Sequence, residues 1–199
     1  MGVERNCMRD QISRVLGQGP VREALRELEA LRLVESETYR GTRVRALASA
    51  RELEEAGQVR GILEETAAQW AAAALKRNIS PLRAELEAIR KAAATCDLNA
   101  YARHNMAFHR LIVEASGNAL LLRVWDSLML EVRTRIGLAR HDIELTDAAE
   151  THAPIVDAFD RGDGETAGRL LREHAQVFCH GEQYGKALKV STALATSMA

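Results

Sequence analysis

HAPIVDAFDRGDGETAGRLLREH, residues 152–174, indicates two helices joined by a glycine turn. Apolar residues stand three, four and seven positions after His152, and a similar spacing surrounds His174, so both histidines lie on the apolar faces of helices. Between them, Gly162-Asp163-Gly164 interrupts the helical rhythm. The stretch therefore predicts two packed helices, each of which turns a histidine toward the core.

The same helical spacing extends back to about residue 50. Breaks with glycine, proline or a capping residue divide it into six segments, at about residues 51–76, 80–96, 97–116, 119–140, 146–161 and 164–184. Six helices with short connections form an antiparallel bundle. We therefore predict a mainly all-α chain with a six-helix bundle in residues 49–185, followed by a frayed tail in residues 186–199.

Composition limits the class of protein. Of the 199 residues, 28% are charged and 47% are apolar, which is typical of a globular chain rather than a disordered or fibrous one. No apolar run approaches the roughly 20 residues of a membrane helix, and the start does not resemble a signal peptide. Three widely spaced cysteines fit a reducing compartment, so the expected location is cytoplasmic. Because the net charge is −1, contact with DNA would need a local basic patch.

Residues 1–48 differ from the rest of the chain. An amphipathic helical pattern opens at Pro20, with Arg22 and Arg26 one turn apart on its polar side. LVESETYRGTRVRAL, residues 33–47, then indicates a small β-hairpin. The turn contains Gly41, and three arginines lie along the hairpin: Arg40, Arg43 and Arg45.

A helix followed by such a hairpin is typical of a partial winged helix-turn-helix. In that motif the helix enters the major groove and the wing grips the neighbouring DNA backbone. The alternative is a solvated helix and hairpin that pack on the bundle and bind no DNA.

Three histidines and one asparagine indicate a metal site in the bundle. Asn105 and His109 are four residues apart on one helix, so their side chains leave the same face from adjacent turns. Together with His152 and His174, they aim three imidazoles and an amide oxygen inward from three helices. Such a set suits Zn2+ or Ni2+, and also Fe2+, Co2+ or Cu2+. The alternative is a group of hydrogen-bonded core histidines.

Other charged residues of the bundle also need partners. Arg60 lies on the predicted inward stripe of the first helix, which is otherwise apolar and includes Leu53, Leu63 and Trp70. A buried cation requires an anion, either the Glu64 carboxylate or a ligand. Arg133 is a candidate for a second cation at that place. His104 lies on a neighbouring stripe and is an alternative metal ligand.

The front piece resembles the GntR family of bacterial transcription regulators. PVREALRELEALRLVE, residues 20–35, and YRGTRV, residues 39–44, are similar to the recognition helix and wing of that family. The resemblance implies that Arg22 and Arg26 contact operator DNA and that Gly41 lies at the wing tip, beside the arginines of the hairpin.

The bundle resembles the FCD ligand-binding domain of the FadR subfamily. AFHRLIVEASGN, residues 107–118, carries this resemblance together with Arg60, Leu63-Glu64 and residues 152–174. It implies a six-helix bundle that holds a metal, commonly zinc, through three histidines and an aspartate or asparagine. An effector carboxylate would complete the metal shell, held by Arg60. Asn105 stands where aspartate is commoner, which removes one negative charge from the ligand set.

The front piece departs from the family pattern in two ways. Leu16-Gly17-Gln18-Gly19 stands where the family has a Ser-Arg pair before the proline. Only about 16 residues precede this turn, which is room for one helix at about residues 3–15. The first helix of the winged domain is therefore expected to be missing, and we expect the 199-residue chain to bind DNA poorly.

Taken together, these patterns predict a ligand-responsive transcription regulator rather than an enzyme. It would bind operator DNA as a homodimer and a small carboxylate within the bundle. One alternative is a sensor of metal or carboxylate that does not bind DNA. The other is a helical metalloenzyme, because three histidines around a metal with an open position can activate water.

Overall fold

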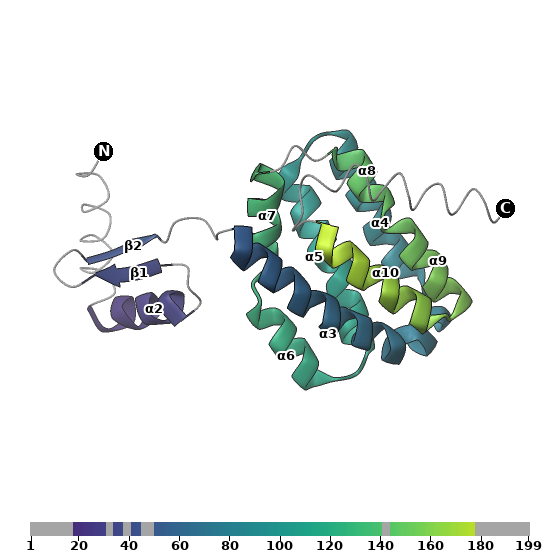
Figure 1. The fold of residues 1–199 in the computed structure, drawn as a ribbon, viewed down its shortest axis with the longest axis horizontal. Helices are drawn as coiled ribbons and strands as arrows, with labels where there is room; N and C mark the ends of the chain where they lie inside the picture. The colour runs from purple at the N-terminus through teal and green to yellow at the C-terminus, as the bar shows by residue number, and fades with distance from the viewer. Residues whose placement is uncertain (1–17, 31–33, 38–40, 45–49, 141–143, 178–199) are drawn as a thin grey trace. The chain divides into compact units, whose positions relative to one another are not determined.

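The computed structural model describes residues 18–30, 34–37, 41–44, 50–140 and 144–177. The chain divides into two compact units, Met1–Leu47 and Ala48–Ala199. Figure 1 shows the helices and strands of both units.

The first unit contains one helix and a hairpin. Helix α2 (Gln18–Ala30) precedes the strands β1 (Val34–Glu37) and β2 (Gly41–Val44), which pair antiparallel with Val34 opposite Val44. The backbone N–H of Ser36 donates to the Glu29 carboxylate at 3.1 Å, which ties the helix to the hairpin. The predicted helix and hairpin are confirmed, although α2 starts two residues before Pro20. The helix expected at residues 3–15 lies outside the described residues.

The second unit is a bundle of helices, and each of the six predicted segments is helical in its described part, the last one as far as Val177. Two of the segments are divided, so the described part of this unit has eight helices. They are α3 (Ala50–Arg77), α4 (Ser80–Ala94), α5 (Leu98–Ala115), α6 (Ala119–Ser127), α7 (Leu130–Arg140), α8 (Leu145–Glu150), α9 (Ala153–Arg161) and α10 (Gly164–Val177).

The two divisions have different causes. Between α6 and α7, Met129 adopts φ +50°, a left-handed conformation that ends a helix. No glycine stands at this position, so the sequence gives no sign of the break. Between α8 and α9, Pro154 is the second residue of the new helix. Because proline lacks an N–H and clashes with the preceding turn, α8 cannot continue through it. The resulting turn holds Thr151 and His152.

Capping residues fix the ends of several helices as the sequence predicts. The Asp97 carboxylate accepts from the backbone N–H of Ala100 at 2.9 Å and starts α5. Asn118 caps α6 in the same way. Gly162 closes α9 with φ +77°, a conformation that glycine adopts without strain.

Helices α3 and α10 lie side by side in the bundle (Figure 1). A Cβ atom at Gly164 would lie 2.8 Å from the Ala72 Cβ, and one at Gly168 would lie 2.8 Å from the Glu65 carbonyl oxygen. The two backbones therefore approach as closely as they do only because these residues are glycines. Trp70, expected on the inward stripe of α3, is instead 51% exposed.

No helix in the described part of the chain is both long and apolar enough to cross a membrane.

Candidate metal and effector site

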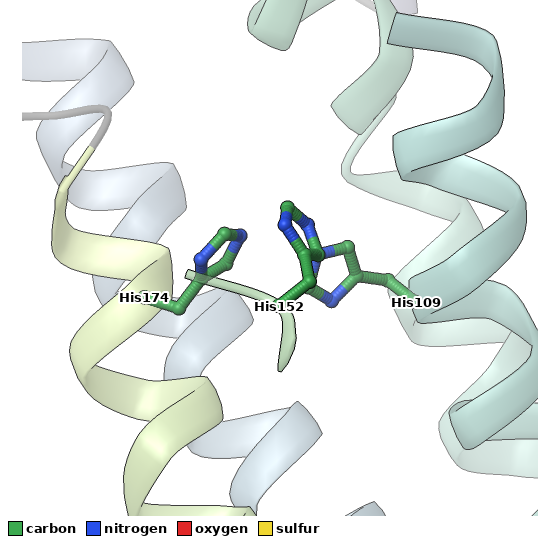
Figure 2. A group of neighbouring side chains, drawn as sticks. All are labelled: His109, His152 and His174. Carbon is green, nitrogen blue, oxygen red and sulfur yellow. The ribbon is translucent and has the colours of Figure 1, made fainter. Parts of the chain in front are cut away.

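Three buried histidines converge inside the bundle (Figure 2). His109 comes from α5, His152 from the turn before α9, and His174 from α10. One ring nitrogen of each lies within 4.8 Å of one from both others. Their ring centroids are 4.4 to 5.5 Å apart. The structure thus brings together the three histidines that helical spacing predicted to face inward.

The protein orients two of these rings through their Nδ1 atoms. His152 Nδ1 lies 3.1 Å from the Ala149 carbonyl, which can only accept, so Nδ1 carries the proton. His174 Nδ1 lies 2.9 Å from the Thr151 hydroxyl, which itself donates to the Ala148 carbonyl at 2.6 Å. The hydroxyl must therefore accept from His174. Both rings keep their Nε2 lone pair for another partner.

A carboxylate faces the third ring. His109 Nδ1 lies 3.0 Å from Glu64 Oε2, at ion-pair distance although outside hydrogen-bond geometry. His109 Nε2 is buried and has no hydrogen-bond partner among the described residues. A proton on Nδ1 favours the contact with the carboxylate, and it again leaves Nε2 as the atom with a lone pair.

The contact between Asn105 and His152 bears on whether these residues fit a cation. Its Oδ1 lies 2.9 Å from His152 Nε2, so two lone pairs face each other when His152 is neutral. Asn105 Nδ2 is buried and has no partner in the described part of the protein. A cation shared by Oδ1 and Nε2 would relieve this contact, and so would an amide turned to donate from Nδ2. The donor set of one amide oxygen and three imidazoles fits a divalent metal.

Burial keeps the three imidazoles neutral. It lowers the pKa of His152 to about 3 and that of His174 well below 6.5. It also lowers the pKa of His109, where the charge of Arg60 acts in the same direction and Glu64 opposes it. Near pH 7 their lone pairs are therefore available to a metal without the loss of a proton.

Arg60 and Glu64 form a buried ion pair beside the histidines. Arg60 Nε donates to Glu64 Oε1 at 2.8 Å, and the residues are 3% and 0% exposed. Trp125 Nε1 donates to the same oxygen at 2.9 Å. Burial would raise the pKa of Glu64, but Arg60, followed by His109, holds it at about 2. The sequence left open whether Glu64 or a ligand supplies the anion for Arg60, and the structure contains the pair with Glu64.

Arg60 also reaches a second environment. Its Nη2 atom is buried without a hydrogen-bond partner in the described ranges, and Arg60 lines a pocket of about 30 Å³. Arg133 lines the same pocket and donates to the Leu128 carbonyl at 2.9 Å. Such a volume holds about two water-sized groups. The three histidines do not line it; Arg60 does, and Arg60 is linked to the histidine cluster through Glu64, which faces His109.

His104 is placed apart from the cluster. Its Nδ1 lies 2.9 Å from the Glu85 carboxylate, and both side chains are partly exposed. His104, the alternative metal ligand, therefore pairs with Glu85 and not with the other histidines.

The arginines expected to contact DNA lie in the first unit. Arg22 and Arg26 are exposed on α2. Arg43, on β2, is exposed and pairs with Glu35 across the hairpin at 2.8 Å. Gly41 begins β2 with φ +77°, which suits a tight turn. Arg40 lies outside the described residues.

Comparison with known proteins agrees with this architecture. The model of the FCD domain family matches residues 55–177. A protein of Paenarthrobacter nicotinovorans named "Probable D-xylose utilization operon transcriptional repressor" is 44% identical over 161 residues, which cover 81% of this chain and 71% of that protein. The chain belongs to the GntR family of transcription regulators and carries an FCD domain.

Solved structures share the fold of this GntR regulator. The McbR/YncC protein of E. coli matches with a TM-score of 0.67 at 24% identity, over 85% of this chain and 83% of that one. A GntR-type regulator from Rhodococcus sp. RHA1 matches with a TM-score of 0.64 at 21% identity, over 84% and 81%. As a member of this family, the chain is a transcription regulator and not an enzyme.

Sequence spacing missed three contacts of the FCD domain. Thr151 orients His174, and Glu64 faces His109 and accepts from Trp125. The partners of Glu64 lie 45 and 61 positions away along the chain, where no helical period relates them. The polar residues were visible, but nothing in the sequence indicates which of them meet.

Proposed function

We propose that this GntR regulator holds a divalent metal in its FCD domain and binds a small carboxylate beside it. Asn105, His109, His152 and His174 would hold the metal, with zinc preferred and nickel as the alternative. The observation that carries the proposal is the convergence of three neutral, buried imidazoles whose Nδ1 atoms all face protein acceptors. Such outer contacts are how proteins orient histidines as ligands.

Charge supports a carboxylate as the effector. Arg60 and Glu64 compensate each other, and the four ligands are neutral. A divalent ion, when bound, would supply positive charge that no residue of the cluster balances. Arg60 Nη2 and Arg133 would donate to the carboxylate group of an anion, since a pocket of about 30 Å³ admits that group and not a whole sugar acid.

The name of the curated relative suggests a class of carboxylate. That relative is named for D-xylose utilization and for repression. A sugar acid combines the hydroxyl groups of such a sugar with a carboxylate that the metal, Arg60 Nη2 and Arg133 would bind. We therefore propose repression as the mode of action and a sugar acid as the effector class.

DNA binding would be the task of the first unit. Arg22 and Arg26 are exposed on one helix, and the hairpin adds Arg43, as a recognition helix and wing require. An effector that binds one arrangement of the regulator more tightly than another would change operator affinity by that difference. A regulator that bound metal and carboxylate but no DNA would instead be a sensor.

A homodimer belongs to the proposal, because two recognition helices match a pseudo-palindromic operator. Large apolar side chains remain exposed on α3 and on α6, which packs against it: Val59, Ile62, Trp70, Leu120 and Val124. A monomer seldom leaves such a group in water, so we place a second copy of the chain on these two helices. Ile62→Glu should then convert a dimer into a monomer in light scattering, and an unchanged dimer would move the interface elsewhere.

Metal titration tests the first part of the proposal. Metal-stripped protein should bind zinc in calorimetry with one site per chain. Asn105→Asp should bind it more tightly, because the aspartate adds a negative charge to the ligand set. Absence of zinc and nickel binding in both proteins would leave the histidines as core residues.

A matched panel tests the effector class. D-xylonate carries a carboxylate, whereas xylitol, its neutral open-chain counterpart, and the cyclic sugar D-xylose do not, so the zinc-loaded protein should bind the first and neither of the others. Succinate and acetate test whether any carboxylate suffices. DNA sequences selected from a random pool then show, in mobility-shift assays, whether the bound acid releases the regulator. A preference for neutral xylose would refute the role of Arg60.

A further inference from the structure

Glu64 joins three elements of the bundle through one buried carboxylate. Its Oε1 accepts from Arg60, on the same helix, and from Trp125 of α6. Its Oε2 lies 3.0 Å from His109 Nδ1 of α5. Neither the ligand set nor the effector pocket includes this residue.

The anchor of His109 differs from those of the other two histidines. His152 is held by a backbone carbonyl and His174 by a hydroxyl, and both are neutral groups next to the turn before α9. Only His109 faces a charged acceptor. A carboxylate at Nδ1 fixes the ring orientation and makes the other ring nitrogen a stronger ligand.

We propose that Glu64 is a positioning residue, which orients His109 for the metal and transmits occupancy of the site to Trp125. The inference rests on the proposed function, since it requires that the histidine cluster binds a metal. When His109 binds a cation through Nε2, its Nδ1–H becomes a stronger donor and attracts the carboxylate. The same carboxylate holds Trp125, which is 4% exposed and anchors α6 in the core, so the environment of the indole must change.

The two tryptophans of the chain make this measurable. Trp70 is 51% exposed, so Trp70→Phe leaves Trp125 as the only emitting indole while phenylalanine keeps an apolar aromatic side chain at the proposed dimer surface. In this background Glu64→Gln is compared with Glu65→Gln. The second change is a matched control, because within the described residues the Glu65 carboxylate pairs with Arg172 at 2.6 Å and not with a histidine of the cluster.

Zinc chloride and nickel chloride are titrated into each metal-stripped protein by calorimetry and by fluorescence. The Trp70→Phe protein and its Glu65→Gln variant should bind zinc equally and change their Trp125 emission. Glu64→Gln should lose roughly 10- to 100-fold in zinc affinity. It should also lose the emission change, even when the site is saturated.

A second variant guards against loss of folding. Arg60→Met/Glu64→Gln leaves neither charge buried alone, and circular dichroism shows whether it is folded. The proposal predicts the same loss of affinity and emission change in this variant. If folded Glu64 variants bind zinc like the control, or keep the emission change, the positioning role is overturned while the metal site stands. If the Trp70→Phe protein itself binds neither metal, the proposed site and this inference fail together.

Discussion

The buried pair of Arg60 and Glu64 predicts a large loss of stability for Arg60→Met. Methionine keeps the apolar stem and much of the volume, but the Glu64 carboxylate is left without its main cation. The difference between an ordinary glutamate at 4.5 and Glu64 at about 2 corresponds to about 3 kcal/mol at ~1.4 kcal/mol per pKa unit. Breaking a buried pair at one partner generally costs about 3 to 5 kcal/mol, so we expect a loss in that range at pH 7.

Urea unfolding followed by circular dichroism measures this loss in metal-free protein with a chelator present. The set consists of the parent, Arg60→Met, Glu64→Gln and the double variant. Because the double variant buries no lone charge, it should lose much less than the two single variants together. The deficit of Arg60→Met should also shrink toward pH 5, where burial without a cation favours protonation of Glu64.

Two results would refute this account. If Arg60→Met is as stable as the parent at pH 7, the ion pair adds nothing to the folded state. If the losses of the single variants add in the double variant, the two residues are not coupled. In the first case Arg60 would serve the ligand alone, and in the second case it would stabilise the fold independently of Glu64.

Further predictions concern the metal, the DNA and the pH. His152→Ala should lower bound zinc well below the parent level in elemental analysis, whereas His104→Ala should not; equal zinc in both would remove the histidine site. Arg22→Ala and Arg26→Ala should each weaken operator binding, by about 1 to 3 kcal/mol if the arginine contacts a base. If both variants shift operator DNA like the parent in mobility-shift assays, α2 does not contact the DNA. Between pH 6.5 and about 3, His152 is protonated in the unfolded chain but not in the folded chain. The free energy of unfolding of metal-free protein should therefore fall as the pH falls. The contribution of this group is at most about 1.4 kcal/mol per pH unit. Urea unfolding measures the slope, which should diminish in His152→Ala; an equal slope in both would show that this histidine does not control it.

The sequence predicted the histidine cluster because helical spacing determines which side chains face the core. His109, His152 and His174 each stand three or four positions from buried apolar neighbours, so their burial followed from local periodicity. Their convergence required only that the helices pack around one core. The same reasoning placed Arg60 inward.

Other features depended on contacts or conformations that periodicity does not encode. Trp70 belongs to an apolar stripe on α3 that is wider than the buried face of the helix. Helical spacing does not show which side of such a stripe remains exposed to water. The break at Met129 uses a positive φ at a residue with no turn preference. The break before Pro154 did have a signal in the sequence, the proline itself. The junction at Glu64 joins residues from α3, α5 and α6, which only the tertiary packing brings together.

The close approach of α3 and α10 limits how the bundle can move. At Gly164 and Gly168 the backbone of α10 rests mainly against backbone and Cβ atoms of α3, so at these two points little side-chain rearrangement is available to let the helices slide. Shear between packed helices needs such adjustable side chains. Helices α3 and α10 should therefore behave as a single rigid lever, and α3 begins directly after residues 45–49, which connect it to the first unit. Under the proposed function, a change at His174 on α10 would therefore move α3 together with α10 rather than displace one helix along the other.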